Sequence, residues 1–437
     1  MRLQKYDSYK DSGVEWLGEI PSEWEVKKLK YISKLVGGFP FNGQKFNTDI
    51  GVNVVRIGDI NKNIKLETCI KSNENNIHKH TKIVKNDTLI ALSGATTGKS
   101  CYIQQELNNA YINQRIAKFN YINSFLYFCI SNQKFKKDIL LGADGSAQEN
   151  ISNTKIENMY IPFPLLTEQQ KIALFLDTKT QQLDKAIKQK EQLIKLLKER
   201  KQIVINEAVT KGLDKTVTMK DSGVEWLGEI PKHWEVKKIK YLGKFINGYA
   251  FNSNEFVEEG IRVMKISNIQ TMKTDWTDSS YISEKYYDKL KQFRVNENDL
   301  VFALTRPIIS TGIKATIIKD TEKILLNQRN TMLKPNSIVY IKWLYFIILN
   351  NDFIQIFDNL IDKTGQQPNI STKDIENIEI PLPHKDEQKQ IVEYIENQTS
   401  KIDNAIDLQQ KQIDKLKEYK TSLIDSIVTG KVRVCDE

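Results

Sequence analysis

The stretch GATTGKS (94–100) has the residue types of a phosphate-binding loop, in which backbone N–H groups and a lysine hold nucleotide phosphates. That loop needs four residues between its glycines, whereas three separate Gly94 from Gly98. The following residues, CYIQQ (101–105), have the pattern of a strand, although a phosphate loop opens a helix. The pattern therefore favours a tight turn in a β-rich region. Nucleotide-dependent catalysis stays open as an alternative that a nucleotide-binding assay would reveal.

Other residues that could do chemistry also have simpler explanations. The His78 and His80 pair favours a solvated turn over a metal site, and Glu387-x-Lys389, which matches part of a nuclease motif, falls at an expected helix start. No C-x-x-C pair occurs, so reduced thiols in a cytosol are expected. The N-terminal segment lacks the apolar run of a signal peptide. The sequence predicts a cytoplasmic chain without a metal site or catalytic constellation. The four cysteines are Cys69, Cys101, Cys129 and Cys435.

The net charge permits a polyanionic partner. The chain has 437 residues, a formal net charge of +9 and a pI of about 9.0. Its 40% apolar residues are ordinary for a globular protein of two to four domains. A basic chain of this kind is compatible with nucleic acid, although charge alone does not establish it.

The chain is an internal repeat. Residues 10–31 and 220–241 are identical at 19 of 22 positions. Further matches follow in the same order: VRIGDI (55–60) with MKISNI (264–269), the two NQR tripeptides, and the two LYF tripeptides. Two homologous halves of about 210–220 residues follow from this spacing. In each half, short apolar runs between Asn, Asp, Gly and Lys turns predict a mixed α/β head.

Each half ends in a segment that predicts one long helix. Proline pairs stop the preceding strands, a Thr167-x-x-Gln170 capping box and Asp386 are the expected helix starts, and Gly212 and Gly430 are the expected ends. Both segments carry an apolar seam with a 3.5-residue repeat, interrupted by polar residues at the same three positions, which predicts a coiled coil. The apolar seam residues are Ile172, Leu176, Leu183, Ile187, Ile194, Leu197, Ile391, Ile395, Ile402, Ile406, Ile413 and Leu416.

Antiparallel pairing of the two helices is the economical geometry, because each helix leaves its own head and ends near the start of the other repeat. The expected fold class is α+β: two homologous α/β heads separated by an antiparallel two-helix coiled coil, with an internal pseudo-twofold. A purely structural coiled-coil dimer is the alternative that this pattern leaves open.

The order of these motifs resembles the specificity (S) subunit of type I restriction–modification systems. The resemblance is carried by IPFPLLTEQQKIALFL (161–176) and IPLPHKDEQKQIVEYI (380–395), together with the two WLGEIP segments, the NQR tripeptides and the helix ends AVTKG and IVTGK. It covers essentially the whole chain. It implies target recognition domains at 1–165 and 213–384, a central long helix at 166–212 and a C-terminal long helix at 385–437.

The resemblance also implies a function. Each head would read one half of a bipartite, asymmetric site in double-stranded DNA, and the coiled coil would set the spacing. Two methyltransferase (modification) subunits would dock on this chain and restriction subunits would join for cleavage. S-adenosylmethionine and ATP with Mg²⁺ would bind those partners, which would form an adenine-specific DNA methyltransferase and endonuclease, and this chain would be non-catalytic. A stand-alone bivalent DNA-binding regulator is the alternative.

Basic side chains of the heads are the candidates for DNA contact, because lysine and arginine bind phosphates and arginine also reads guanine. Gln114 and Gln328 recur in both halves, which favours a structural role for them. The candidate DNA-binding residues are Arg56, Lys62, Lys99 and Arg115 in the first head, and Lys265, Lys273, Arg306 and Arg329 in the second.

The near-identical segments 10–31 and 220–241 indicate surfaces for two copies of one protein partner, since fold maintenance does not require identical exposed residues. The middles of the two halves, such as 65–80 and 274–289, share almost nothing. A recent recombination that homogenised these segments is the alternative explanation. The predicted partner-binding residues are Trp16, Leu17, Trp226 and Leu227.

Overall fold

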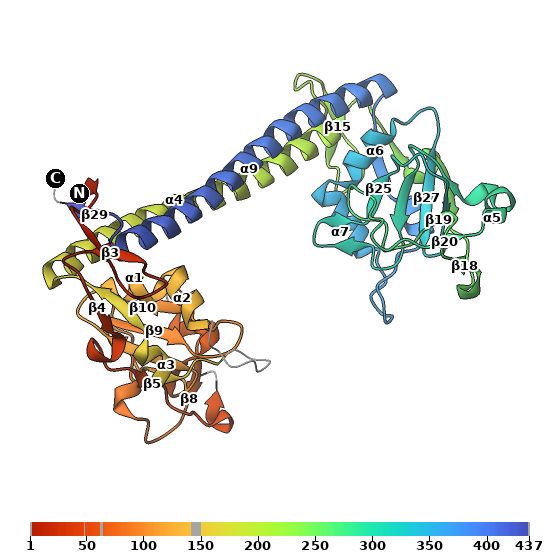
Figure 1. Cartoon of the computed structure of the whole chain (residues 1–437). Coiled ribbons are helices and arrows are strands. Elements are labelled where there is room, and N and C mark those ends of the chain that lie inside the picture. Colours follow the sequence, from red (N-terminus) through yellow and green to blue (C-terminus); the bar gives the residue numbers. More distant parts are fainter. Residues whose placement is uncertain (1, 48, 62–63, 141–149, 436–437) are drawn as a thin grey trace. The chain divides into compact units, whose positions relative to one another are not determined.

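The chain forms two compact units, each of which combines one head with part of each long helix. The computed structural model describes residues 2–47, 49–61, 64–140 and 150–435. The first unit comprises Met1–Glu191 and Gln410–Glu437, and the second comprises Gln192–Gln409. The division expected from sequence treated the long helices as separate segments, whereas the structure divides each helix between the two units (Figure 1).

The first head contains two four-stranded sheets. One has the order β10 (Ser100–Tyr102), β9 (Asp87–Ala91), β12 (Ile116–Asn120) and β5 (Val36–Gly37), and all its neighbours are antiparallel. The other has the order β11 (Ala110–Ile112), β7 (Val52–Val55), β8 (Ile70–Ser72) and β6 (Phe46–Asn47). Strands β7 and β11 are parallel, with Val55 opposite Ile112. Helices α1 (Phe125–Ser131) and α2 (Gln133–Leu140) follow β12 and contribute Phe125, Phe128 and Phe135 to the core.

The second head repeats this topology with one more strand at the edge of its second sheet. Its first sheet has the order β17 (Gly243–Asn247), β27 (Asn330–Pro335), β22 (Leu300–Ala303) and β25 (Ala315–Ile317). Its second sheet contains β18 (Phe256–Val257), β20 (Tyr281–Ile282), β19 (Ile261–Met264), β26 (Ile324–Leu326) and β21 (Arg294–Val295). Strands β19 and β26 are parallel, as β7 and β11 are. The two halves predicted from the repeat are therefore two copies of one fold.

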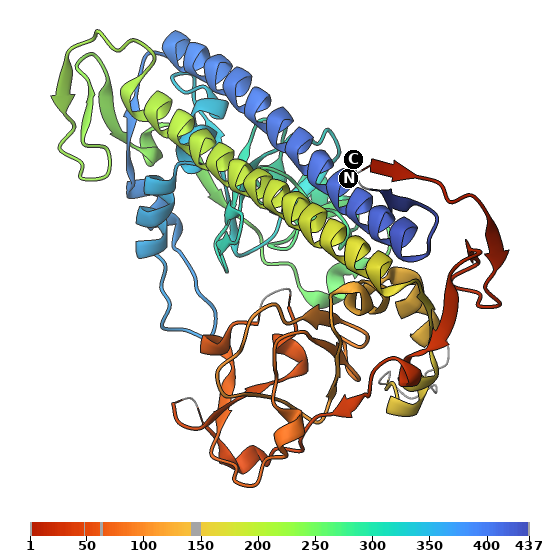
Figure 2. The same ribbon diagram turned by 90° about the vertical axis from the view of Figure 1, so that its left-hand side faces the viewer.

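Two long helices, α4 (Leu166–Lys211) and α9 (Lys385–Val428), lie side by side in each unit (Figure 2). In the first unit Lys190 of α4 donates to Gln412 of α9, and Lys420 of α9 donates to Asp184 of α4. An earlier position in α4 is therefore paired with a later position in α9. The helices are therefore antiparallel, as predicted. Among the described helices, none is long and apolar enough to cross a membrane.

The predicted apolar seam lies between the two helices. Ile172 and Leu176 share a core with Leu423 and Ile427 in the first unit. Every seam residue is at least half-buried, whereas Leu196 and Leu408, which are off the seam, are exposed. The buried seam residues are Ile172, Leu176, Ile187, Ile391, Ile395 and Ile413, and the half-buried ones are Leu183, Ile194, Leu197, Ile402, Ile406 and Leu416.

Two of the polar seam positions carry matching ion pairs. Lys420 Nζ lies 2.8 and 2.9 Å from the two carboxylate oxygens of Asp184, and Lys201 Nζ lies 2.7 and 2.8 Å from those of Asp403. Lysine and aspartate both recur at an offset of 219 residues. Polar pairs in a coiled-coil seam select one register of the helices over others.

We expect a double-mutant cycle with Asp184→Ala and Lys420→Ala to give a coupling energy of about 1 kcal/mol, because both side chains are partly withdrawn from solvent. Denaturant unfolding of the four proteins measures it. The exposed pair Lys195–Glu199, 3.8 Å apart, is the control and should couple by about 0.3 kcal/mol or less. Equal coupling for the two pairs would argue against a register role.

Both long helices begin one residue before the caps expected from sequence. Helix α4 starts at Leu166, and the backbone N–H groups of Glu168 and Gln169 donate to the Leu165 carbonyl, so Thr167 lies inside the first turn. Helix α9 starts at Lys385, so Asp386 is not its cap either. The Gln169 side chain instead donates to the Pro164 carbonyl, and Gln388 repeats this bond with Pro383.

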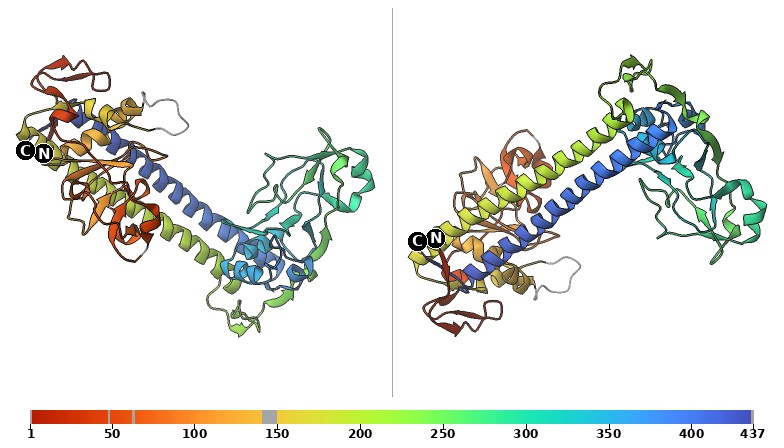
Figure 3. Two further views of the ribbon diagram at one scale, coloured as in Figure 1. Left: turned by 90° about the horizontal axis from the view of Figure 1, so that it is seen from below. Right: turned by 90° about the horizontal axis from the view of Figure 1, so that it is seen from above.

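The last helix ends close to Gly430, as expected, and the C-terminal segment 385–437 continues beyond it into a strand. Helix α9 ends at Val428, and β29 (Arg433–Cys435) pairs with β1 (Arg2–Gln4). The backbone of Gly430 has φ +75°, a left-handed conformation that favours glycine and stops a helix. The two ends of the chain therefore meet in the first unit (Figure 3).

Candidate nucleic-acid interface

Three of the four basic residues predicted in the first head lie along one edge of its sheets. Arg56 directly follows β7, and Arg115 follows β11. Because β7 and β11 are parallel, their carboxyl ends reach the same edge, where the Asn113 N–H donates to the Val55 carbonyl at 3.0 Å. We call residues 56–61, 94–99 and 113–115 the first rim.

Lys99 joins this rim through the turn between β9 and β10. Its ammonium group donates to Asn61 Oδ1 at 2.9 Å, and the Thr96 hydroxyl donates to the Ile57 carbonyl at 3.4 Å. The Leu92 N–H bonds the Arg115 carbonyl at 2.9 Å, which connects the same turn to Arg115. The fourth predicted residue, Lys62, lies outside the described residues.

The second head builds an equivalent edge. Lys265 follows β19 and Arg329 follows β26, and the Asn327 N–H donates to the Met264 carbonyl at 3.1 Å between these parallel strands. The Leu304 N–H bonds the Arg329 carbonyl at 2.8 Å, so the loop with Arg306 joins the same edge. Lys273 lies in a turn closed by the Gln270 N–H and the Lys273 carbonyl. We call residues 265–273, 304–314 and 327–329 the second rim.

The cations on the rims differ in how far they are neutralised. Lys265 bonds Asp278 at 2.9 Å, and this hydrogen bond holds the pKa of the Asp278 carboxyl below its usual value. Arg56 Nε lies 3.8 Å from Asp59. Arg115, Arg306 and Arg329 are exposed, and no carboxylate of the described residues pairs with them. Their guanidinium groups can donate to phosphate oxygens or to the acceptor edge of guanine.

The backbone of the second rim is held in an unusual conformation at its arginines. Arg306 has φ +47° and Arg329 has φ +65°. A left-handed backbone at a residue with a Cβ costs roughly 1–2 kcal/mol, so the surrounding hydrogen bonds must enforce it. The Arg306 N–H bonds the Pro368 carbonyl at 2.8 Å. Strain of this kind is typical of loops that present functional side chains.

Each NQR tripeptide packs against a glycine of the GFPF or GYAF segment, a contact that the sequence did not reveal. A Cβ on Gly38 would lie 2.0 Å from the Asn113 carbonyl oxygen, and one on Gly248 would lie 1.9 Å from that of Asn327. The N–H groups of Gln114 and Gln328 bond the carbonyls of Phe39 and Tyr249. The backbone of each NQR tripeptide therefore has the same packing in both heads, whereas the structural role expected for the two glutamine side chains stays a prediction.

The glycine-rich stretch 94–100 is a hairpin turn. Gly94 and Gly98 have φ +82° and +76°, and strand β10 follows directly where a phosphate loop would open a helix. The expected turn is therefore confirmed. His78 and His80 have ring centroids 5.2 Å apart, and the described part of the chain contains no group of three metal-ligating side chains.

The start of each long helix is fastened to its head by a tryptophan. Trp24 Nε1 donates to Glu168 Oε2 at 3.0 Å, and Trp234 Nε1 donates to Glu387 Oε1 at 3.0 Å. Both tryptophans are fully buried. Glu387 therefore has a structural role at the start of its helix.

Comparison with known proteins gives the family. A family model described as the type I restriction modification DNA specificity domain matches residues 21–196 and 231–418, one match on each repeat and most of the chain together. The chain belongs to the type I restriction–modification DNA specificity family.

Relatives and solved structures agree with this assignment. The chain is 28% identical to the type I restriction enzyme MjaVIII specificity subunit of Methanocaldococcus jannaschii, over 99% of this chain and 98% of that protein. The EcoAI specificity subunit of Escherichia coli is 34% identical over 38% of this chain and 28% of its own length. The HsdS subunit of Thermoanaerobacter tengcongensis has the same fold, with a TM-score of 0.55 at 15% identity over 94% of this chain and 98% of its own. A chain from a structure of a type I R-M system assembly has a TM-score of 0.70 with this chain. It is 15% identical, and the match covers 94% of this chain and 98% of that chain.

Of the four residues predicted to bind a partner of this specificity-family chain, Trp16, Leu17 and Leu227 are buried core residues, and Trp226 is half-buried at the edge of its core. Trp16 and Leu17 are 6% and 2% exposed, and Trp16 Nε1 donates to the Tyr160 carbonyl at 3.1 Å. Leu227 is also buried, and Trp226 is half-buried with its Nε1 bonded to the Glu379 carbonyl. The three buried side chains are used inside their own heads, so a partner surface shared by both segments would come mainly from their exposed members. Those exposed members include Lys10, Glu15, Glu19, Lys220, Glu225 and Glu229.

Proposed function

We propose that this chain is the DNA specificity subunit of a type I restriction–modification complex and that each head reads one half of a bipartite site. The observation that carries the proposal is the pair of equivalent rims, which present Arg115 and Arg329 at matching positions. Family membership supports the same role. Among the described residues, no feature favours a stand-alone regulator over this role.

The two heads have similar sheets but differ in the segments that connect the strands. Residues 65–80 of the first head contain two short 3-10 turns and β8, whereas residues 274–289 of the second contain β20 and the helix α5 (Lys285–Lys289). Phosphate contacts position a protein on DNA, and contacts with base edges specify the sequence. Similar sheets would place the two heads on DNA in the same way, and different connecting segments would read half-sites of different sequence.

The chemistry of the complex is assigned to partner subunits. Two methyltransferase subunits would dock on the exposed residues shared by segments 10–31 and 220–241, and restriction subunits would join them. S-adenosylmethionine and ATP with Mg²⁺ would bind these partners. Two copies of one docking surface account for identical exposed residues on two heads that otherwise differ.

Exchanging residues 33–150 for the corresponding head of another family member tests this function. The complex containing the exchanged chain is expected to methylate a site in which one half has changed and the other is retained. Sequencing of methylated positions in genomic DNA measures the outcome.

The chain supplies its own matched control. Replacing residues 33–150 by its own residues 243–369, which share the order of the first sheet and the parallel strand pair of the second, should give a site that contains one half-site sequence twice. If both half-sites changed in the first exchange, or neither did, the modular function would be refuted.

A further inference from the structure

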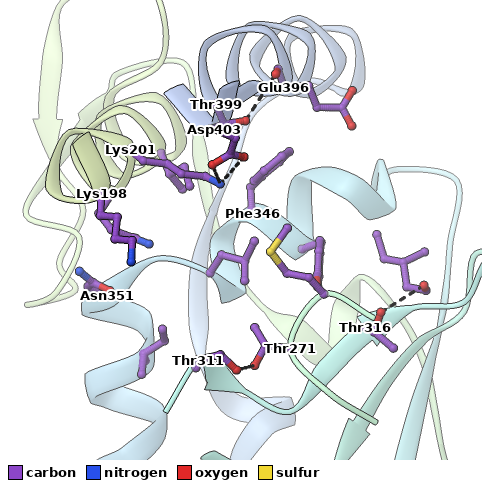
Figure 4. A pocket seen from close by; sticks show the side chains of 18 of the residues that line it. Lys198, Lys201, Thr271, Thr311, Thr316, Phe346, Asn351, Glu396, Thr399 and Asp403 are labelled. Atoms are coloured by element: carbon purple, nitrogen blue, oxygen red, sulfur yellow. Dashed lines mark hydrogen bonds and ion pairs between the residues drawn. The ribbon is translucent and has the colours of Figure 1, made fainter. Parts of the chain in front are cut away.

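Each unit contains a cleft where the head meets the two long helices. The first cleft has a volume of about 380 Å³ and lies between β10, α1, α2 and the helices α4 and α9. The second has a volume of about 1000 Å³ and lies between the same two long helices, α6 (Ile341–Ile348), α7 (Asn351–Asn359) and the hairpin of β23 and β24 (Figure 4).

The two clefts are equivalent sites of the repeat. The residues that α4 contributes to one cleft are contributed by α9 to the other, at an offset of 219 residues. Three of these positions carry identical charged side chains in both clefts, although the heads themselves have diverged. The identical pairs are Lys417 with Lys198, Lys420 with Lys201, and Asp184 with Asp403.

Each cleft retains unneutralised positive charge. Lys420 and Lys201 are neutralised by Asp184 and Asp403, as described for the helix seam. Lys417 and Lys198 are exposed, and no carboxylate of the described residues pairs with either. Figure 4 shows Lys198 reaching into the second cleft beside the Lys201–Asp403 pair.

A second lysine adds to the charge of each cleft. Lys136 lines the first cleft and Lys319 lines the second, again without a carboxylate partner among the described residues. Lys342, also in the second cleft, is neutralised by Glu396 at 2.7 Å. Two unpaired ammonium groups in each cleft favour an anionic occupant.

Both clefts are continuous with the rims. A Cβ on Gly98 would lie 3.9 Å from Lys136 Cγ, so the first cleft adjoins the turn that carries Lys99. Burial and the neighbouring Lys99 lower the pKa of the Lys136 ammonium group, which an adjacent anion would reverse. In the second unit, Thr271 lines the cleft and bonds Thr311 at 3.1 Å, two residues from Lys273 of the rim.

We propose that each cleft mouth binds sugar–phosphate backbone of the DNA next to the half-site read by its head, with Lys417 and Lys198 as the shared contacts. This inference rests on the proposed function and deepens it. Base sequence differs between the two half-sites, so the loops that read it have diverged. The phosphate backbone is the same at both, so the side chains that bind it are retained. The contacts would hold the DNA against the helix pair without reading sequence.

The double variant Lys198→Gln and Lys417→Gln tests the proposal in the assembled complex with its methyltransferase subunits. Removal of two phosphate contacts should make the slope of log K against log salt concentration less steep by about 1.8. Affinity for the duplex carrying the methylated motif and for a scrambled duplex should fall by the same factor, because the lost contacts read no bases.

The control is Lys195→Gln with Lys415→Gln, which removes two exposed lysines from the same helices outside the clefts. Its salt slope should match that of the unaltered complex. An unchanged slope in the cleft variant would overturn the proposal, and so would loss of methyltransferase subunits from it, since that result would identify an acidic protein segment as the occupant. If the unaltered complex did not prefer the motif duplex, the proposed function itself would fail, which is a separate outcome.

Discussion

Replacing Asp87 by Asn is expected to destabilise the first unit by about 3 kcal/mol, because it leaves a buried lysine without its counter-charge. Lys118 Nζ lies 2.8 Å from Asp87 Oδ2, and the two side chains are 8% and 0% exposed. Asp87 also accepts hydrogen bonds from the Val84 N–H and from the Asn120 side chain, so it connects β9 to β12 and to the loop before β9. Hydrogen exchange of the amides in β9 and β12 measures the loss within the first unit.

The control for Asp87→Asn is Glu74→Gln, which removes a surface ion pair with Lys45 at 2.6 Å. It should cost less than about 1 kcal/mol, since Lys45 remains solvated. A further variant, Asp87→Asn with Lys118→Met, should recover part of the lost stability because no unpaired charge stays buried. Equal losses for Asp87→Asn and Glu74→Gln would contradict the prediction.

Gly248→Ala is expected to weaken binding of the second half-site and to destabilise the second head by about 2–3 kcal/mol, a typical cost of overpacking. The new Cβ would lie 1.9 Å from the Asn327 carbonyl oxygen and 2.3 Å from its carbon, so the backbone of the NQR turn must move. That turn holds Arg329, and its displacement would move Arg329 away from the DNA contact that we propose for it. Thermal unfolding and binding to duplexes altered in one half-site at a time measure the two effects.

Gly43→Ala is the matched control, since nothing lies within 4 Å of its new Cβ and its backbone is not left-handed. Neither stability nor half-site preference should change in it. Gly38→Ala should reproduce the effect of Gly248→Ala at the first half-site, because its Cβ would lie 2.0 Å from Asn113 O. A shift of preference at the wrong half-site would contradict the assignment of rims to half-sites.

The long helices and the repeated sheets were predictable from the sequence because their signals are periodic and local. The spacing of residues such as Ile172 and Ile391 along one helix face predicts that they are buried. Apolar runs such as 86–93 predict buried strands. The matching polar positions in both seams predicted the pairing of the helices, and the structure adds that Lys201 and Lys420 are satisfied there by aspartates.

The features that the sequence did not reveal depend on partners far away in the chain. Trp16 is buried and donates to the Tyr160 carbonyl, 144 positions later in the chain. The repeated segment 10–31 therefore contains two core residues, Trp16 and Leu17, which its sequence alone did not distinguish from surface residues. Thr167 has the residue type of a helix cap, but Leu165 and Gln169 take over that role. The rim basic residues could be proposed individually, whereas their convergence on one edge follows from a parallel strand pairing that no local pattern encodes.

The contribution of α9 to the first unit has a consequence for biosynthesis. Leu423, Ile427 and Val428 belong to the same core as Trp24 and Phe125, and Gly430 packs so closely on Pro21 that a Cβ there would lie 2.2 Å from its ring. During translation the N-terminal head therefore leaves the ribosome with part of its apolar interior uncovered. It stays so until residues 410–435 emerge, after the entire second unit has been made. Nascent chains stalled before that point should be targets for chaperones and proteases in a way that the released protein is not.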